Sequence, residues 1–154
     1  MPLVVKATVS DAAGDSYTSV AYADGYFLAR PNVKWTAANL TLKEGALIAA
    51  TDYIMSRWGR SFIDDVYSAL TVPVQLQRAT AEYAVRALSG PLIPDPVVGA
   101  NGLGQVLKRK KTGPLEKEWE TVGSASRPSL FRAYPSADIL MVPLVKTATD
   151  RVFR

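Results

Sequence analysis

The chain contains no cysteine and no histidine among its 154 residues. Without cysteine it can form no disulfide and has no thiol nucleophile, and without either residue type the usual Cys/His zinc sites are excluded. The absence of histidine also excludes the commonest general base of enzymes. We therefore expect a protein that is not an enzyme, with no catalytic residue, no metal site and no cofactor.

Long apolar segments are also lacking. No apolar run reaches the ~20 residues that a membrane-spanning helix requires. The first residues, Met1-Pro2-Leu3-Val4-Val5-Lys6, lack the basic start and long apolar core of a signal peptide. The apolar fraction of 48% is nevertheless enough for a hydrophobic core. These features predict one soluble domain that stays inside the producing cell and has no membrane partner.

Acidic residues are scarce in the last third of the chain. Residues 1–103 hold 8 Lys/Arg and 9 Asp/Glu, a net charge of −1, whereas residues 104–154 hold 10 and 5, a net charge of +5. A basic segment of this kind indicates an acidic partner or nucleic acid nearby.

Three segments show helical spacing of apolar residues. The first spans about residues 16–29, where Asp15 or Ser16 can cap the helix. The second begins at a capping box, Thr41-x-x-Glu44, in which each side chain bonds a free backbone N–H at the other position. It ends near Gly59, and the third helix begins near Pro73 and ends at Gly90-Pro91.

The remaining segments complete the predicted fold. The connection formed by residues 60–72 is longer than structureless loops usually are, which predicts a short helix there. The apolar residues of the segment 137–142 predict a last helix or strand. We expect a mainly α fold: a small bundle of three to five helices with an inserted β-hairpin and extended termini. The predicted boundaries within this single domain are an N-terminal arm (1–15), a helical bundle (16–103), the hairpin (104–123) and a C-terminal segment and tail (124–154).

The predicted hairpin has one basic arm and one mostly acidic arm around a turn at Thr112-Gly113-Pro114. The basic arm holds Lys108, Arg109, Lys110 and Lys111, and the acidic arm holds Glu116, Glu118, Trp119 and Glu120. The basic run could bind phosphates, but glutamates on the opposite strand can neutralise it, and alternate residues face opposite sides of a strand. We favour paired or solvated charges over a phosphate site.

The three tryptophans could stack nucleic-acid bases, as aromatic residues do in single-strand binders. Trp58 lies on an apolar helical face, however, which favours core packing. Trp119 lies between two glutamates, which would repel a phosphate backbone. The adjacent pair Asp64-Asp65 is similarly interpreted as a cap or a solvated turn, because neighbouring side chains diverge in helix and strand alike.

The order of these segments resembles that of tailed-bacteriophage head–tail connector (adaptor) proteins. The likeness covers most of residues 16–145, and it rests on five stretches: Ser16 to Phe27; Trp35 with Lys43 to Ile54; Val72-Pro73 with Gln77 to Ala84; Lys111 to Glu116; and Tyr134 to Leu140. The chain departs from this family between Arg60 and Val72, where relatives often have a Trp-Pro-Arg segment. Many relatives carry the label DnaT-like single-stranded DNA-binding protein.

The resemblance implies a subunit that assembles, commonly as twelve copies, into a homo-oligomeric ring beneath the phage portal protein. Such a ring lets double-stranded DNA pass and joins the head to the next neck, stopper or tail protein, so the expected location is the virion neck. The resemblance also implies an assembly role for the hairpin (Lys108, Arg109, Lys110, Lys111, Gly113, Glu116, Glu118, Trp119) and portal docking by the tail (Lys146, Arg151, Phe153, Arg154). The alternative function is a single-stranded DNA-binding replication accessory protein.

Overall fold

The computed structural model describes residues 2–93, 97–98, 104–111, 116–121 and 132–146, with side chains for residues 2–93 and 132–146. The chain forms two compact units. The first, called the helical unit, comprises Met1–Leu92 and Ala133–Arg154, and the second, called the strand unit, comprises Ile93–Arg132. The strand unit is thus inserted into the sequence of the helical unit.

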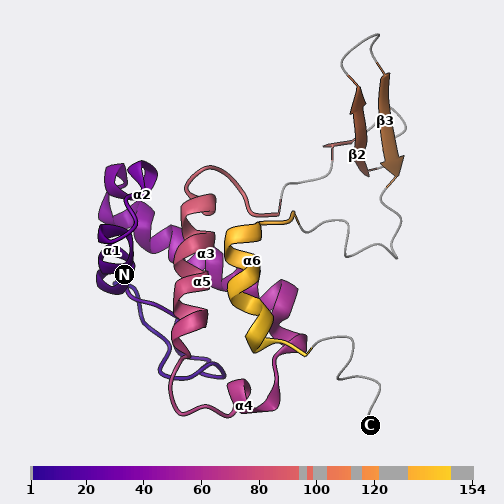
Figure 1. Ribbon diagram of the computed structural model, residues 1–154. Coiled ribbons are helices and arrows are strands. Elements are labelled where there is room, and N and C mark those ends of the chain that lie inside the picture. Colours follow the sequence, from indigo (N-terminus) through magenta and orange to yellow (C-terminus); the bar gives the residue numbers. More distant parts are fainter. Residues whose placement is uncertain (1, 94–96, 99–103, 112–115, 122–131, 147–154) are drawn as a thin grey trace. The chain divides into compact units, whose positions relative to one another are not determined.

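The helical unit contains six α-helices among its described residues (Figure 1). They are α1 (Val20–Leu28), α2 (Val33–Ala37), α3 (Leu40–Trp58), α4 (Asp64–Tyr67), α5 (Val74–Ala87) and α6 (Pro135–Met141). Two 3-10 turns, η1 (Gly59–Ser61) and η3 (Val142–Leu144), follow α3 and α6. The prediction of a mainly helical fold is confirmed, although it counted three to five helices. The short α2 was not predicted, whereas α4 and η1 lie where a short helix was expected.

Polar side chains fix where the first helices begin, and they differ from the predicted caps. Ser19, not Asp15 or Ser16, caps α1, and its Oγ accepts a hydrogen bond from the backbone N–H of Tyr22. Asn39, not Thr41, caps α3, and its Oδ1 accepts from the N–H of Leu42 at 2.9 Å. The capping-box prediction was wrong because α3 begins at Leu40, two residues before the first position that Thr41 would cap, and Asn39 therefore takes the N-cap role.

The segment before α1 is tied to the helical unit by backbone contacts. A parallel bridge pairs Val5 with Ser16, and the N–H of Lys6 donates to the carbonyl of Ser16 at 2.7 Å. Gly14 allows this close approach, because a Cβ at that position would lie 2.6 Å from the backbone of Lys6. Ser16 therefore belongs to the bridge and Ser19 caps the helix, so α1 begins at Val20, later than the apolar spacing predicted.

The core lies where α5 packs against α3, α6 and α1 (Figure 1). Its larger members come from several elements and are almost fully buried: Tyr17, Phe27, Trp35, Leu47, Ile54, Leu76, Tyr83 and Met141. Three alanines of α5, Ala79, Ala81 and Ala84, are completely buried, and small residues of this kind let neighbouring helices approach closely. The burial of Leu47, Ile54, Leu76 and Tyr83 confirms the predicted inner faces of α3 and α5.

The end of the described chain returns to the middle of the helical unit. The N–H of Ile63 donates to the carbonyl of Leu144, and the N–H of Lys146 donates to the carbonyl of Ser61 at 2.6 Å. Phe62 and Val145 form an antiparallel bridge between these two segments. No helix in the described residues is long and apolar enough to span a membrane.

The strand unit holds three antiparallel strands in the order β1 (Val97–Val98), β2 (Gly104–Lys111) and β3 (Glu116–Thr121). The register places Arg109 opposite Glu118 and Lys111 opposite Glu116, with an irregularity in β2 between Leu107 and Arg109. The predicted turn, residues 112–115, lies outside the described residues, as do the side chains of these strands. The inserted hairpin therefore stays a prediction.

Candidate functional site

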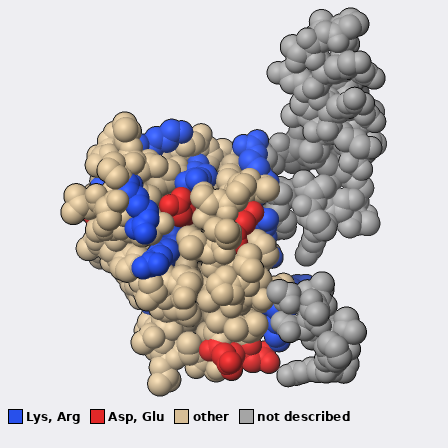
Figure 2. All heavy atoms as spheres, in the orientation of Figure 1, with Lys and Arg blue, Asp and Glu red and all other residues tan. Residues whose placement is uncertain are grey.

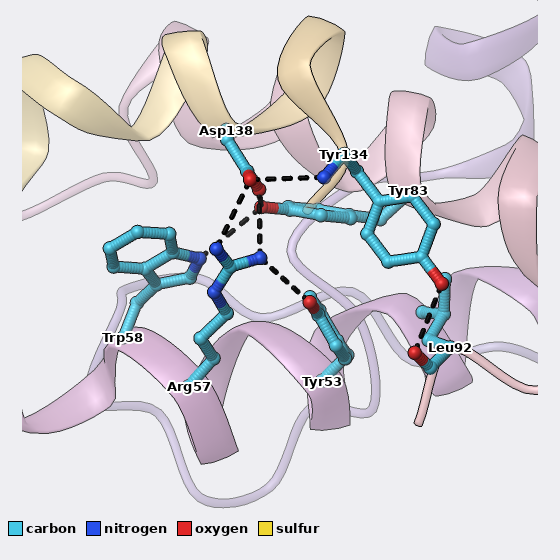
Figure 3. Close-up of polar contacts among 7 residues, drawn as sticks. All are labelled: Tyr53, Arg57, Trp58, Tyr83, Leu92, Tyr134 and Asp138. Atoms are coloured by element: carbon cyan, nitrogen blue, oxygen red, sulfur yellow. Dashed lines mark hydrogen bonds and ion pairs between the residues drawn. The ribbon is translucent and has the colours of Figure 1, made fainter. Parts of the chain in front are cut away.

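A cluster of polar and aromatic side chains joins α3, α5 and α6 (Figure 3). We call it the Asp138 cluster. Tyr53, Arg57 and Trp58 come from α3, Tyr83 comes from α5, and Tyr134 and Asp138 come from the N-cap and body of α6. Helical spacing brings Tyr53 and Arg57 to one side of α3, because positions four apart are neighbours on a helix surface.

Asp138 is the centre of the cluster because its carboxylate accepts four hydrogen bonds. Two come from the guanidinium of Arg57, at 3.0 Å to Oδ1 and 3.1 Å to Oδ2. The hydroxyl of Tyr83 donates to Oδ1 at 2.5 Å, and the backbone N–H of Tyr134 donates to Oδ2 at 3.0 Å. Such charge-assisted, bidentate contacts are stronger and more directional than neutral hydrogen bonds. One carboxylate thus links all three helices.

Aromatic contacts surround this ion pair. The rings of Tyr53, Tyr83 and Tyr134 lie in mutual contact, with centroids 5.0 to 6.0 Å apart and tilted or edge-on geometry. The guanidinium of Arg57 lies 4.5 Å from the ring centroid of Trp58, whose Nε1 donates to the hydroxyl of Tyr83 at 3.2 Å. The side chains of Arg57 and Asp138 remain 17% and 20% exposed, so the pair is largely shielded from water.

Burial and hydrogen bonding shift the titration of the cluster. Burial, followed by the hydrogen bond to Asp138, raises the pKa of Tyr83 far above its ordinary value. Burial likewise raises the pKa of Tyr53, against the opposing effect of its hydrogen bond with Arg57. Desolvation alone would lower the pKa of Arg57, but the contact with Tyr53 and the charge of Asp138 outweigh it and raise that pKa. The cluster therefore holds Tyr53 and Tyr83 neutral and Arg57 charged.

The cluster also lies where the strand unit interrupts the helical unit. The hydroxyl of Tyr134 donates to the backbone carbonyl of Leu92 at 3.0 Å (Figure 3). Leu92 is the last residue of the helical unit before the insertion, and Tyr134 is the second residue after it. This hydrogen bond therefore holds together the two points at which the chain leaves and re-enters the helical unit.

The residues predicted for the assembly hairpin fall in the strand unit. Lys108, Arg109, Lys110 and Lys111 lie on β2, and Glu116, Glu118 and Trp119 lie on β3. The register puts opposite charges across from each other at two positions, but it also puts Lys110 opposite Lys117. Gly113 and all of these side chains lie outside the described residues, so the assembly role stays a prediction.

Of the residues predicted for portal docking, the structure describes Lys146. Lys146 belongs to the helical unit, and its Nζ lies 2.9 Å from Oδ1 of Asp64. Asp64 and Asp65 are exposed in the first turn of α4, as a solvated turn predicts. Arg151, Phe153 and Arg154 lie outside the described residues, and docking stays a prediction.

Sequence reasoning did not predict the Asp138 cluster. Arg57 and Asp138 are 81 residues apart, and no spacing rule relates two such positions. The one available signal was local: a tyrosine at position 53 and an arginine at position 57 are four apart on a predicted helix. The described residues contain no group of three or more His, Cys, Asp or Glu side chains that could hold a metal ion.

Comparison with known proteins assigns the chain to a family. The family model described as "Putative DnaT-like ssDNA binding protein" matches residues 1–154, so the chain belongs to that family. Neither the curated proteins nor the solved structures contain a significant match. The printed description names single-stranded DNA binding, which agrees with the alternative function predicted from the sequence and does not mention a phage connector.

Proposed function

We propose, from the resemblance of its segments to head–tail connector proteins, that this member of the DnaT-like family is a structural head–tail connector subunit of a tailed bacteriophage. In this proposal, copies of the chain form a ring under the portal protein, of the twelve-fold kind expected from the resemblance. The ring lets DNA pass and joins the head to the next neck or tail protein. The observation that carries the proposal is the insertion of a separate strand unit at the Asp138 cluster of an internally packed helical unit.

The helical unit supports a scaffolding role because its polar groups are largely satisfied within it. The described ion pairs of Arg57, Arg86 and Lys43 are all internal to this unit. A 40-residue insertion, Ile93–Arg132, is then available for contacts with neighbouring copies. Exposed strand edges can extend the sheet of a neighbour, and one heterologous contact repeated head to tail closes a ring.

The C-terminal tail supports the portal contact in the same proposal. The backbone bonds of residues 144–146 with residues 61–63 fix the point at which the tail begins. We expect Arg151, Phe153 and Arg154 beyond that point to dock onto the portal protein, with Lys146 at the start of the tail.

A second candidate is a single-stranded DNA-binding replication accessory protein, and the printed family description favours it over the connector. The geometry of the helical unit favours it less. Single-strand binders stack bases on exposed aromatic rings, but Trp35 is 1% exposed and Tyr17 and Tyr83 are 0% exposed. A stacking surface would have to use other aromatic residues, such as Trp119.

The two candidates are distinguished by where the chain is found. Quantitative mass spectrometry of purified particles of the encoding phage should detect several copies of the chain per particle. Detection in infected-cell extracts but never in purified particles would refute the connector and leave the replication accessory. A tail-shortened variant lacking residues 147–154 should fold normally and be missing from particles, because it retains the helical unit and loses the expected portal contact.

A further inference from the structure

One face of the helical unit carries an excess of exposed cations. We call it the basic face, and it consists of Arg30, Lys34, Arg78 and Arg86. The first three are exposed and Arg86 is half-buried. In the space-filling view, Lys and Arg lie over the side of the molecule where α1, α2 and α5 lie, with smaller acidic patches among them (Figure 2). The acidic surface at the foot of this view is separate.

Local contacts bring these cations together. Arg78, Glu82 and Arg86 are spaced four apart and form one stripe along α5. The hydroxyl of Tyr26 on α1 donates to Oε1 of Glu82 at 3.1 Å, and the guanidinium of Arg30 lies 4.5 Å from the centroid of the Tyr26 ring. The basic face therefore spans α1 and α5 continuously.

The charges of the basic face are only partly neutralised. Glu82 pairs with Arg86 at 2.8 Å, and Asp24, the acid of α1, pairs with Lys43 at 2.8 Å. In the described part of the chain, no carboxylate pairs with the remaining three cations, Arg30, Lys34 and Arg78. The face therefore carries uncompensated positive charge, which attracts a polyanion.

Hydroxyl groups lie among the cations. Nζ of Lys34 bonds Oγ of Ser89 at 2.8 Å, and a guanidinium nitrogen of Arg86 bonds Oγ of Ser136 at 2.5 Å. Arginine, lysine and serine are the side chains that contact DNA phosphates without reading bases. From Arg78 to Ala87, the end of α5, the helix axis covers about 13.5 Å. One B-form strand presents a phosphate about every 3.4 Å, so several phosphates fit that length.

We propose that the basic face binds the phosphate backbone of DNA without sequence preference. The inference rests on the proposed function only in that both candidates bring the chain next to DNA. It places the contact on Arg30 after α1, on Lys34 of α2, and on Arg78 and Arg86 of α5, and not on residues 108–111 of the strand unit. Three uncompensated cations make a weak, salt-sensitive contact, which suits DNA that must move past the protein.

An acidic protein is the competing partner for such a face. Protein interfaces often depend on an aromatic anchor that enters a pocket of the partner. Tyr26, the aromatic ring of this face, is already held by Arg30 and Glu82, so it is not free to act as an anchor. We therefore assign the face to DNA and include an acidic polypeptide in the test.

The test measures how DNA affinity depends on salt. Binding of the full-length chain to labelled oligothymidine and to a duplex is followed by fluorescence anisotropy over a series of salt concentrations. Each neutralised phosphate of a single strand contributes about 0.7 to the slope of log K against log salt. The triple variant Arg30→Ser, Lys34→Ser, Arg78→Ser should therefore lose about 2 from the slope, and comparison of the two probes shows which form of DNA is bound.

A matched pair of single variants controls for net charge. Arg78 and Arg60 are both exposed. Arg78→Ser should reduce the slope by about 0.7, whereas Arg60→Ser, away from the basic face on η1, should leave it unchanged. Equal slopes for the two variants, or an unchanged slope in the triple variant with intact thermal unfolding, would overturn the proposal. A second result would also overturn the proposal. If the chain binds poly-glutamate in preference to both DNA probes, and the triple variant loses this binding, the basic face is assigned to an acidic protein.

Assembly is measured on the same samples by electron microscopy. If the chain forms rings but the triple variant has the same slope of log K against log salt as the unmodified chain, the proposed DNA-binding face is overturned and the connector proposal stands. A changed slope with no ring under any condition would support the face and count against the connector.

Discussion

Replacing Asp138 tests whether the Asp138 cluster holds the helical unit together. Asp138→Asn keeps the side-chain shape but removes the charge that accepts two bonds from Arg57 and one from Tyr83. Breaking a fully buried ion pair costs about 3–5 kcal/mol. The pair here keeps 17% and 20% side-chain exposure, and the asparagine oxygen can still accept one bond. We therefore expect a loss of about 2–3 kcal/mol in the free energy of unfolding.

Urea denaturation followed by tryptophan fluorescence measures this loss, because Trp58 lies within the cluster. The same change should lower the melting temperature by about 4–12 °C. Asp52→Asn is the matched control: it is the same substitution at an exposed position of α3, and it should cost less than about 0.5 kcal/mol. A double-mutant cycle with Arg57→Met should give a coupling energy of about 1–3 kcal/mol.

The result that would refute this reasoning is a loss in Asp138→Asn no larger than in the Asp52→Asn control. A large loss with no coupling to Arg57 would also contradict it, because the cost would then come from the tyrosine contacts or the backbone of α6 and not from the ion pair.

Three further predictions concern pH, local packing and assembly. The pKa of Tyr83 is raised above its ordinary value near 10. The stability that Tyr83 contributes should therefore be complete below about pH 10 and should be lost as the pH rises further. The urea midpoints measured at about pH 9 and pH 11 should differ less for the Tyr83→Phe variant than for the unmodified chain. Gly14→Ala should cost about 1–3 kcal/mol, because its Cβ would clash with the backbone of Lys6, whereas Gly45→Ala, with open space in the middle of α3, should gain about 0.5–1 kcal/mol in the same denaturation assay. Replacing residues 108–111 with serine should impair assembly more than folding, and an equal loss of melting temperature and of ring formation would count against an assembly role.

The helices that carry most of the core were predictable because each has a strong local signal. The inner faces of α3 and α5 follow helical spacing, and Leu47, Ile54 and Leu76 are buried as that spacing predicts. The starts of α1 and α3 were not predictable from the same rule. In both cases more than one residue that could cap the helix lies within a few positions. For α1, Ser16 is engaged in backbone contacts with the segment before the helix, and Ser19 is the cap.

The candidate site could not be predicted from the sequence. Asp138 was noticed only as part of the family-like stretch from Tyr134 to Leu140, and nothing local pairs it with Arg57 or Tyr83. Those contacts exist because α6 returns to α3 and α5 after the insertion. The cations of the basic face were similarly hidden, because Arg30 and Arg78 are isolated in the sequence and are brought together only by the packing of α1 against α5.

The most direct test of the connector is electron microscopy of the purified chain, alone and mixed with the portal protein of its phage. The proposal predicts closed rings of identical subunits, formed either by the chain alone or on the portal. Particles that remain monomeric under both conditions, while the same preparation binds oligothymidine tightly, would contradict the connector and support a single-stranded DNA-binding function.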